Sequence, residues 1–297
     1  MKISVIVPVR DDPRIDDLLV SLAAQRGAPP FEVVLALDGA RRQPNVPAGI
    51  GARLLRLAPR GPYAARNSAA REAGGEILLF TDSDCLCPPG WIARAAAVFG
   101  DESLAALQGA SVPTSPSRLS RFVQLEYDRY VESHAAAGYR RFCNTRNFAV
   151  RAAVVRELPL PDRFPRGGDG VYGRRLEARG IPIRYDPDWT VEHRHPTTRW
   201  REGARAFEEG RDAARWQAAE DIDLFGRVSP ASGPGAWLLE ATGGSRLARR
   251  VAAAALIPVA ALFAGASTIL PDATAAAAFS RFRRSAHLAG RLSGEAT

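Results

Sequence analysis

An uninterrupted apolar run from Ile77 to Phe80 most constrains what this chain can fold into. A strand with one wet face alternates apolar and polar residues, whereas an unbroken apolar run indicates a strand buried on both faces. Such strands occur in parallel sheets that are covered by helices on both sides. Two carboxylates, Asp82 and Asp84, follow this strand, and a buried strand has no structural use for them.

Apolar strands and helical segments alternate through the first 111 residues. Strands are expected at 3–7, 31–37, 52–57, 76–80 and 105–111, and helices at 15–25, 63–73 and 91–99. Alternation in short units predicts an α/β fold with a mostly parallel central sheet flanked by helices. After residue 112 the pattern loosens. Helices are expected there at 119–133, 170–178 and 199–219, and short strands at 148–150 and 181–185.

The chain is strongly basic, with a net charge of +8 and a pI of about 10.1 over 297 residues. Arginine supplies this excess, since Lys2 is the only lysine. A basic surface suits phosphates, anionic lipid or nucleic acid. No arginine-rich run with interleaved aromatics and no zinc-ligand spacing is present, so we expect no nucleic-acid partner.

The three cysteines are Cys85, Cys87 and Cys143. An odd, small number in a chain of this length argues against a disulfide framework and favours a reducing compartment. Burial as small apolar side chains is their expected role. Residues 1–8 are too short and strand-like for a signal peptide. The expected location is therefore the cytoplasm, with the inner face of the cell membrane as a narrower alternative.

Residues 251–270 carry no charge and are rich in alanine. Twenty apolar residues are long enough to cross a hydrocarbon layer of ~30 Å. Pro258 interrupts the segment, and arginines flank it at 249, 250 and 281. Three arrangements stay open: a spanning helix, a helix packed on the domain, and a helix lying at a membrane surface. Membrane surface contact through 246–284 is the corresponding hypothesis.

The carboxyl ends of strands are where open α/β sheets bind ligands. Two carboxylates at such an end can hold Mg²⁺ or Mn²⁺, which bind oxygens and keep positions open for phosphate. Further polar residues follow in order along the chain. They are Asp38 after a strand, Arg66 on the helix before Asp82, Asp169 at a helix start, and His193 and His195.

Several segments together resemble the family 2 glycosyltransferases, which are inverting enzymes of the GT-A fold. The resemblance covers about residues 1–215. The segments that carry it are Ile3-Ser-Val-Ile-Val-Pro8, Val34-Leu-Ala-Leu-Asp-Gly39, Gly61-Pro-Tyr-Ala-Ala-Arg-Asn67, Gly75-Glu-Ile-Leu-Leu-Phe-Thr-Asp-Ser-Asp84, Pro89-Gly-Trp91, Asn144-Thr-Arg-Asn-Phe-Ala149 and Gly168-Asp169. The resemblance implies a GT-A-type nucleotide-diphospho-sugar transferase fold, and the C-terminal tail lies outside it.

The same resemblance implies roles for the polar residues. Pro8, Asp38, Arg66 and Asp82 would bind the nucleotide sugar. Asp84 would ligate a divalent cation, Mg²⁺ or Mn²⁺, and His193 or His195 would add a further contact, with His193 the better fit by position.

Asp169 would be the general base that removes the proton of the acceptor hydroxyl. Members of the family often carry Glu-Asp at this point, and Gly168 departs from that pattern. The alternatives are a turn cap for Asp38, a surface helix arginine for Arg66 and a helix N-cap for Asp169. For Asn67 we expect a structural role, bonding the local backbone.

The resemblance implies a nucleotide-sugar-binding half (1–111) and an acceptor-binding and catalytic-base half (112–221). From about residue 222 the composition shifts to glycine, proline and alanine, which predicts an alanine-rich helical appendage (222–297). The resemblance also implies a metal-dependent, inverting transfer of one sugar from a nucleotide-sugar donor to an acceptor hydroxyl. Related processive synthases carry Gln-x-x-Arg-Trp, but this chain has Asp212 where the glutamine would be, which favours a single transfer.

A lipid-linked acceptor and a role in cell-envelope polysaccharide or glycolipid synthesis are weaker inferences from the basic charge and the apolar tail. Two other functions stay open: a sugar nucleotidyltransferase and a non-catalytic nucleotide-sugar-binding scaffold. The sugar, the nucleotide and the acceptor are not readable from the sequence.

Overall fold

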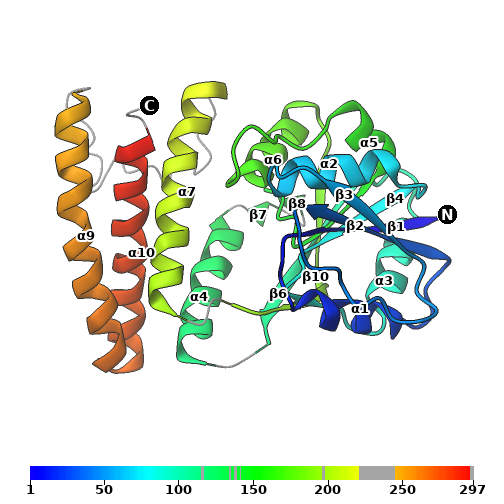
Figure 1. Cartoon of the computed structure of the whole chain (residues 1–297), viewed down its shortest axis with the longest axis horizontal. Helices are drawn as coiled ribbons and strands as arrows, with labels where there is room; N and C mark the ends of the chain where they lie inside the picture. The colour runs from blue at the N-terminus through cyan, green and yellow to red at the C-terminus, as the bar shows by residue number, and fades with distance from the viewer. Residues whose placement is uncertain are drawn as a thin grey trace. The chain divides into compact units, whose positions relative to one another are not determined.

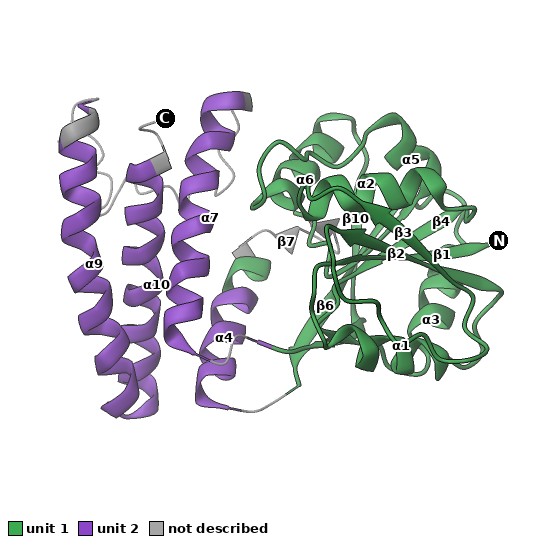
Figure 2. Cartoon of the chain, viewed as in Figure 1, with its two compact units in different colours: residues 1–115, 129–194 green, residues 116–128, 195–297 purple. Residues whose placement is uncertain are grey.

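A computed structural model describes residues 1–114, 117–133, 135–136, 139–140, 142–195, 198–220 and 245–294. These residues form two compact units (Figure 2), here called the sheet unit (1–115 and 129–194) and the helical unit (116–128 and 195–297). Their boundaries differ from the segments 1–111, 112–221 and 222–297, because the helix at 199–220 and the start of the helix at 118–133 group with the C-terminal helices. The functional meaning given to those three segments stays a prediction.

The order of elements is shown in Figure 1. The strands are β1 (Ile3–Val9), β2 (Phe31–Asp38), β3 (Ala52–Leu57), β4 (Ile77–Thr81), β5 (Cys85–Leu86), β6 (Ala106–Pro113), β7 (Ala135–Ala136), β8 (Tyr139–Arg140), β9 (Asn147–Arg151) and β10 (Ile183–His193). The helices are α1 (Ile15–Ala23), α2 (Pro62–Glu72), α3 (Trp91–Val98), α4 (Arg118–Ser133), α5 (Ala152–Glu157), α6 (Gly168–Ala178), α7 (Arg199–Glu220), α9 (Arg246–Ile269) and α10 (Asp272–Gly294).

The described strands form one sheet in the order β3-β2-β1-β4-β9-β6-β10-β8-β7, with β5 paired to β10. Strands β1 to β4 run parallel to one another. β9 is antiparallel to both β4 and β6, and β6 is parallel to β10. The carboxyl ends of β2, β4 and β10 therefore meet the start of β9 at one edge of the sheet. The α/β fold with a mostly parallel sheet is confirmed.

Side chains alternate between the two faces of the sheet. On β1, Val5 and Val7 pack with α1 and α3, while Ile6 packs with α2 and α6. On β4, Leu79 belongs to the first of these clusters and Leu78 to the second, and both are fully buried. The unbroken apolar run thus reflects a strand covered by helices on both faces, as Figure 1 also shows.

The helical unit contains α7, α9 and α10 together with the first part of α4. Phe122 of α4, Ala206 of α7, and Phe279 and Phe282 of α10 share one buried cluster with Ala264 of α9. The predicted C-terminal appendage is helical over the described residues 245–294. The remainder of that predicted segment, 222–244 and 295–297, lies outside the part of the chain that the structure describes.

Two expectations about the strands are wrong in extent. The strand expected at 3–7 continues to Val9 as β1, because Pro8 sits beside Ala36 of β2 as an ordinary strand residue. The strand expected at 181–185 begins at Ile183 and continues to His193, with an irregularity between Asp186 and Thr190. Polar residues and a proline in 186–192 interrupt the apolar pattern, so the second half of this strand carries no apolar run.

Candidate active site

Asp82 follows β4 directly, and Arg66 of α2 forms a hydrogen-bonded ion pair with it. Arg66 is only 4% exposed, so it is not the surface helix arginine that was the alternative. Its Cζ lies 5.6 Å from the ring centre of Tyr63 on the same helix. A buried guanidinium at the carboxyl end of a parallel strand is well placed to bind a phosphate.

Asp84 lies between β4 and β5, and its Oδ2 is 3.3 Å from Nε2 of His193. The pairing of β5 with β10 sets Cys85 opposite His193, and this register brings the histidine next to Asp84. The backbone N–H of Arg194 also donates to the carbonyl of Asp84, at 3.1 Å. His193, which is 109 positions further along the chain than Asp84, is thereby held against the Asp82–Asp84 turn.

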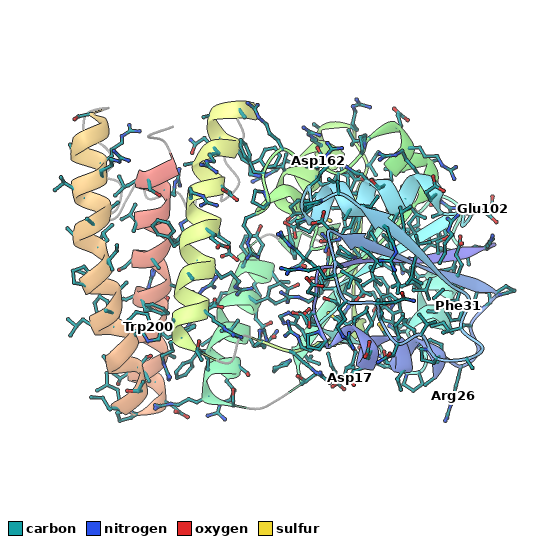
Figure 3. All side chains as sticks on the ribbon, in the orientation of Figure 1. Asp17, Arg26, Phe31, Glu102, Asp162 and Trp200 are labelled. Atoms are coloured by element: carbon teal, nitrogen blue, oxygen red, sulfur yellow. The ribbon has the colours of Figure 1, made fainter. Side chains whose placement is uncertain are left out.

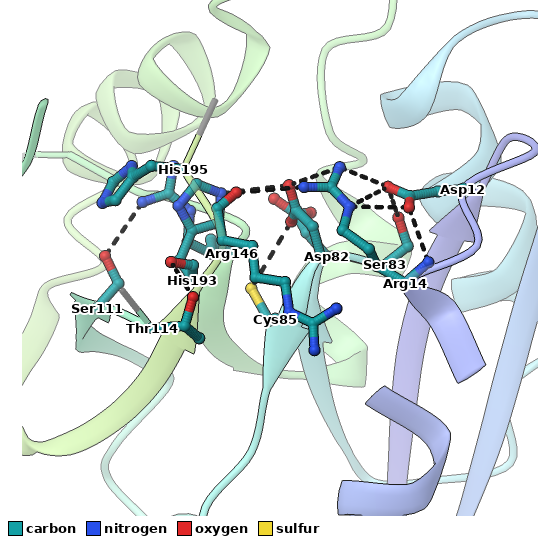
Figure 4. Close-up of polar contacts among 12 residues, drawn as sticks. Asp12, Arg14, Asp82, Ser83, Cys85, Ser111, Thr114, Arg146, His193 and His195 are labelled. Atoms are coloured by element: carbon teal, nitrogen blue, oxygen red, sulfur yellow. Dashed lines mark hydrogen bonds and ion pairs between the residues drawn. The ribbon is translucent and has the colours of Figure 1, made fainter. Parts of the chain in front are cut away.

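Two arginines add positive charge beside Asp84 (Figure 4). Arg14 donates to both oxygens of Asp12, at 2.9 Å from Nε and 2.7 Å from Nη2, and Nη2 is also 3.4 Å from Asp84 Oδ2. Arg146 precedes β9 and donates to Ser111 Oγ at 3.1 Å. The carboxylate of Asp84 thus has arginines from two separate parts of the chain beside it.

These neighbours set the ionisation of Asp84 and His193. Burial alone would raise the pKa of Asp84, but the hydrogen bond from His193 and the charges of His193, Arg14 and Arg146 lower its pKa below the ordinary value. Burial and the charge of Arg146 lower the pKa of His193, which outweighs the opposing effect of Asp84. At neutral pH the pair is therefore an anionic carboxylate facing an uncharged imidazole.

This donor set fits a divalent cation. An ionised carboxylate has lone pairs to donate, and Nε2 of a neutral His193 would have one once it no longer donates its proton to Asp84. Asp82 supplies a second carboxylate nearby. Among the described residues, no group of three or more His, Cys, Asp or Glu side chains is arranged to hold a metal ion. Asp84 and His193, with Asp82 nearby, are the described side chains that would hold an ion here.

Asp169 lies in the first turn of α6, one residue past the N-terminal Gly168, and is not the N-cap, which is Gly167. Its Oδ1 accepts a hydrogen bond from the hydroxyl of Tyr63 at 3.0 Å and another from the backbone of Gly170. Burial raises the pKa of Asp169, and the charge of Asp82 adds to this, against the lowering effects of Arg66, Tyr63 and Gly170. A raised pKa makes this carboxylate a stronger base.

The presence of glycine at position 168 has a steric explanation. A Cβ at this position would lie 2.6 Å from the carbonyl oxygen of Pro161 and 2.7 Å from the ring of Tyr63. The tyrosine ring fills the space that a side chain at 168 would need, and its hydroxyl serves Asp169 instead. The departure from the family's Glu-Asp pattern thus coincides with a substitute partner for the aspartate.

Asp38, which the resemblance assigns to the nucleotide, makes hydrogen bonds to the protein's own backbone. The buried carboxylate of Asp38 accepts hydrogen bonds from the backbone N–H groups of Arg60 and Gly61, at 2.7 and 3.0 Å, and so fixes the loop before α2. Pro8 is partly exposed within β1. Asn67 exchanges hydrogen bonds with the backbone of Leu160, so its structural role links distant segments, not the local backbone.

The structure separates the two candidate histidines. His193 is in the sheet unit beside Asp84, whereas His195 is in the helical unit, where its Nε2 pairs with Gln124 of α4. The roles given to all these residues stay predictions.

Sequence reasoning missed Arg14, Arg146 and Tyr63 as members of this cluster. Arg146 and Tyr63 both lie inside the segments that carried the family resemblance, which was the signal available.

The three cysteines are free and buried, at 1 to 3% exposure. Burial raises the pKa of Cys87 and of the other two thiols, so they are protonated at neutral pH. Their expected role as small apolar side chains is confirmed.

The family model described as Glycosyl transferase family 2 matches residues 4–158, which is more than half of the chain. Glycosyltransferase AglE of Haloferax volcanii is 26% identical over 129 residues, which are 43% of this chain and 42% of AglE. O-antigen biosynthesis protein RfbC of Myxococcus xanthus is 36% identical over 99 residues, which are 31% of this chain and 8% of RfbC. The matched stretches thus span less than half of either relative.

Solved structures share the fold at low identity. The mannosyltransferase PcManGT from Pyrobaculum calidifontis, in complex with GDP-Man and Mn²⁺, has a TM-score of 0.62 and 19% identity, with 96% of this chain and 85% of that chain covered. TarS from S. aureus, as its 1–349 fragment with UDP-GlcNAc, has a TM-score of 0.52 and 19% identity, with 96% and 90% covered. Both support the GT-A-type architecture.

Proposed function

We propose a function from the premise that this chain belongs to glycosyl transferase family 2, whose model matches residues 4–158. The proposed reaction is the metal-dependent transfer of one sugar from a nucleotide-sugar donor to an acceptor hydroxyl, with inversion at the anomeric carbon. The protein is thus a glycosyltransferase, and the donor class agrees with the GDP-Man and UDP-GlcNAc held by the two structural neighbours.

One observation carries the proposal: the site holds two carboxylates whose pKa values move in opposite directions. The pKa of Asp84 is lowered by His193 and the adjacent arginines, while the pKa of Asp169 is raised by burial. Environments that separate the pKa values of two acids assign them to different tasks. Asp84 is suited to hold a cation, and Asp169 is suited to accept a proton.

The reaction would follow from these assignments. Asp84 and His193, with Asp82 beside them, would hold a divalent cation, which supplies positive charge to the diphosphate leaving group. Asp169 takes the proton of the acceptor hydroxyl while that oxygen forms a bond to the anomeric carbon. The bond from the anomeric carbon to the phosphate oxygen breaks, and its electron pair leaves with the diphosphate. Arg66, which is paired with Asp82, can stabilise that charge.

A single transfer is favoured because the segment that is similar to a processive synthase motif is structural here. Asp212 of α7 is fully buried between Arg211 and Arg215, at 3.1 and 3.3 Å. Trp216 is also fully buried within the helical unit. Buried, ion-paired side chains of this kind are accounted for by packing alone.

A role in assembling cell-envelope polysaccharide or glycolipid is the narrower form of the proposal. Its support is the match to a relative named for O-antigen biosynthesis. The acceptor would then be a hydroxyl of a lipid-linked intermediate, with the enzyme on the cytoplasmic side of the membrane.

The test is turnover with a panel of UDP-, GDP- and dTDP-sugars and Mn²⁺, with nucleoside diphosphate release as the readout. We expect release from one donor class, loss of release with EDTA, and loss of release in Asp169→Asn. A scaffold would bind a donor without turnover. A nucleotidyltransferase would instead release pyrophosphate from a nucleoside triphosphate and a sugar phosphate. Either result would overturn the proposal.

A further inference from the structure

α9 has an outer face that is exposed and entirely uncharged. Four of its large apolar residues, Val251, Ile257, Leu262 and Ile269, are exposed by 62, 58, 71 and 83%. The full outer face consists of Val251, Ala254, Ala255, Ile257, Pro258, Val259, Leu262, Gly265, Thr268 and Ile269. A helix that faces water normally places charged residues there, so a face of this kind indicates a binding surface.

The opposite face of α9 is already used inside the helical unit. Ala260 and Ala264 pack against Phe279 and Phe282 of α10, and Ala253 packs against Leu292. In Figure 1 α9 lies along α10, with α7 on the far side of α10. Within the described part of the helical unit, the packing of α9 therefore leaves its outer face uncovered.

Arginines border this outer face. Arg250 is exposed at one end of α9. Arg281 of α10 is exposed beside the middle of α9, with its Cζ 5.8 Å from the ring centre of Phe263, and Arg284 is exposed one turn later. At the other end Trp200 of α7 is 70% exposed (Figure 3), next to Arg199, which donates to Ser267 of α9 at 2.9 Å. An apolar face bordered by arginines matches the surface of an anionic bilayer.

The neighbours of α9 decide between spanning the membrane and lying on it. By length and composition alone, Ala248–Ile269 could cross a membrane. However, α10 packs along α9, and Arg283 of α10 pairs with Glu202 and Glu209 of α7 at 2.8 and 3.1 Å. A spanning α9 would bring this charged interface into hydrocarbon or would have to leave α10, and buried charges at that depth are costly.

We propose that the outer face of α9 binds an anionic lipid bilayer, with the helix lying in the plane of the membrane surface. The apolar residues enter the boundary between headgroups and acyl chains, and Arg250, Arg281 and Arg284 contact the lipid phosphates. This surface does not depend on the proposed transferase reaction.

The experiment is flotation of the full chain with vesicles of phosphatidylcholine alone or mixed with phosphatidylglycerol. We expect flotation with the anionic vesicles, weaker flotation with the neutral ones, and release by alkaline carbonate. Val251→Glu and Leu262→Glu should each lower the bound-to-free ratio about tenfold. Val20→Glu is the matched control, since Val20 is a helical valine of the sheet unit that is 60% exposed.

Several results would overturn the inference. One is that the protein stays unbound with both vesicles. Another is that it resists carbonate, which would mean that α9 spans the membrane. Equal flotation of Val251→Glu and the wild type would mean that the outer face does not contact the vesicles. A dimer in solution that dissociates in Val251→Glu would mean that a second copy covers this face. Circular dichroism of each variant checks that the fold is retained.

Discussion

Tyr63→Phe should move the acid limb of the pH–rate profile to higher pH. The Tyr63 hydroxyl donates to Asp169 Oδ1 at 3.0 Å, and this bond favours the ionised carboxylate, which is the form that acts as a base. Removing the donor raises the pKa of Asp169 further. Activity that depends on the ionised form is gained as pH rises through that pKa, so the variant needs a higher pH.

The magnitude follows from the bond that is lost. A hydrogen bond to a charged group contributes about 1.5–3 kcal/mol. Asp169 is partly exposed, so water replaces part of this contribution and the lower end applies. About 1.4 kcal/mol corresponds to a tenfold change. On the acid limb, kcat/KM of Tyr63→Phe should therefore fall about tenfold, with a smaller change at high pH.

The assay is nucleoside diphosphate release measured against pH for the wild type, Tyr63→Phe and Tyr172→Phe. Tyr172 is the matched control, since it lies on α6 with Asp169, is fully buried, and its hydroxyl has no hydrogen-bond partner among the described residues. An unchanged acid limb in Tyr63→Phe, or an equal shift in both variants, would refute the reasoning about Asp169.

Two further predictions concern the same site. His193→Ala should weaken Mn²⁺-dependent donor binding at least about tenfold, measured by calorimetric titration, and unaltered Mn²⁺ dependence would rule His193 out as a ligand. Gly168→Ala should destabilise the protein by about 1–3 kcal/mol in urea unfolding, because the new methyl group meets Pro161 and the Tyr63 ring. Gly90→Ala, where a Cβ meets nothing within 4 Å, is the control, and equal stability of the two variants would contradict the steric account.

Much of the sheet unit was predictable because its strands are locally encoded. The run at 31–37 differs from β2 by one residue at its end, and the run at 76–80 differs from β4 by one residue at each end, since apolar patterns mark strands that are buried on both faces. The strand expected at 181–185 was much shorter than β10, because the apolar pattern is interrupted by Asp186, Pro187, Asp188 and Glu192. The true end of β10 at His193 depends on pairing with the end of β6 and with β5, which has only two residues and no signal of its own.

The carboxylates of the site could be predicted from the sequence, but its arginine side chains could not. Asp82, Asp84 and Asp169 follow strands or begin a helix, so their positions could be read from local pattern. The position of Arg14 against Asp84 depends on a fold-level contact across 70 residues, and in a chain with 40 Lys and Arg no single arginine stands out. The tyrosine that supports Asp169 was hidden for the same reason, since it approaches from 106 residues away.

The most direct test of the central claim is a thermal-shift measurement of the wild type, Asp84→Asn and Asp169→Asn with the preferred nucleotide sugar, with and without Mn²⁺. A ligand specific to the folded state raises stability by about 2.7 kcal/mol at 100 times its Kd. We predict a Mn²⁺-dependent shift in the wild type, its loss in Asp84→Asn, and its retention in Asp169→Asn, which binds donor but does not transfer the sugar. A metal-dependent shift that survives in Asp84→Asn would contradict the account, because the cation would then be held elsewhere.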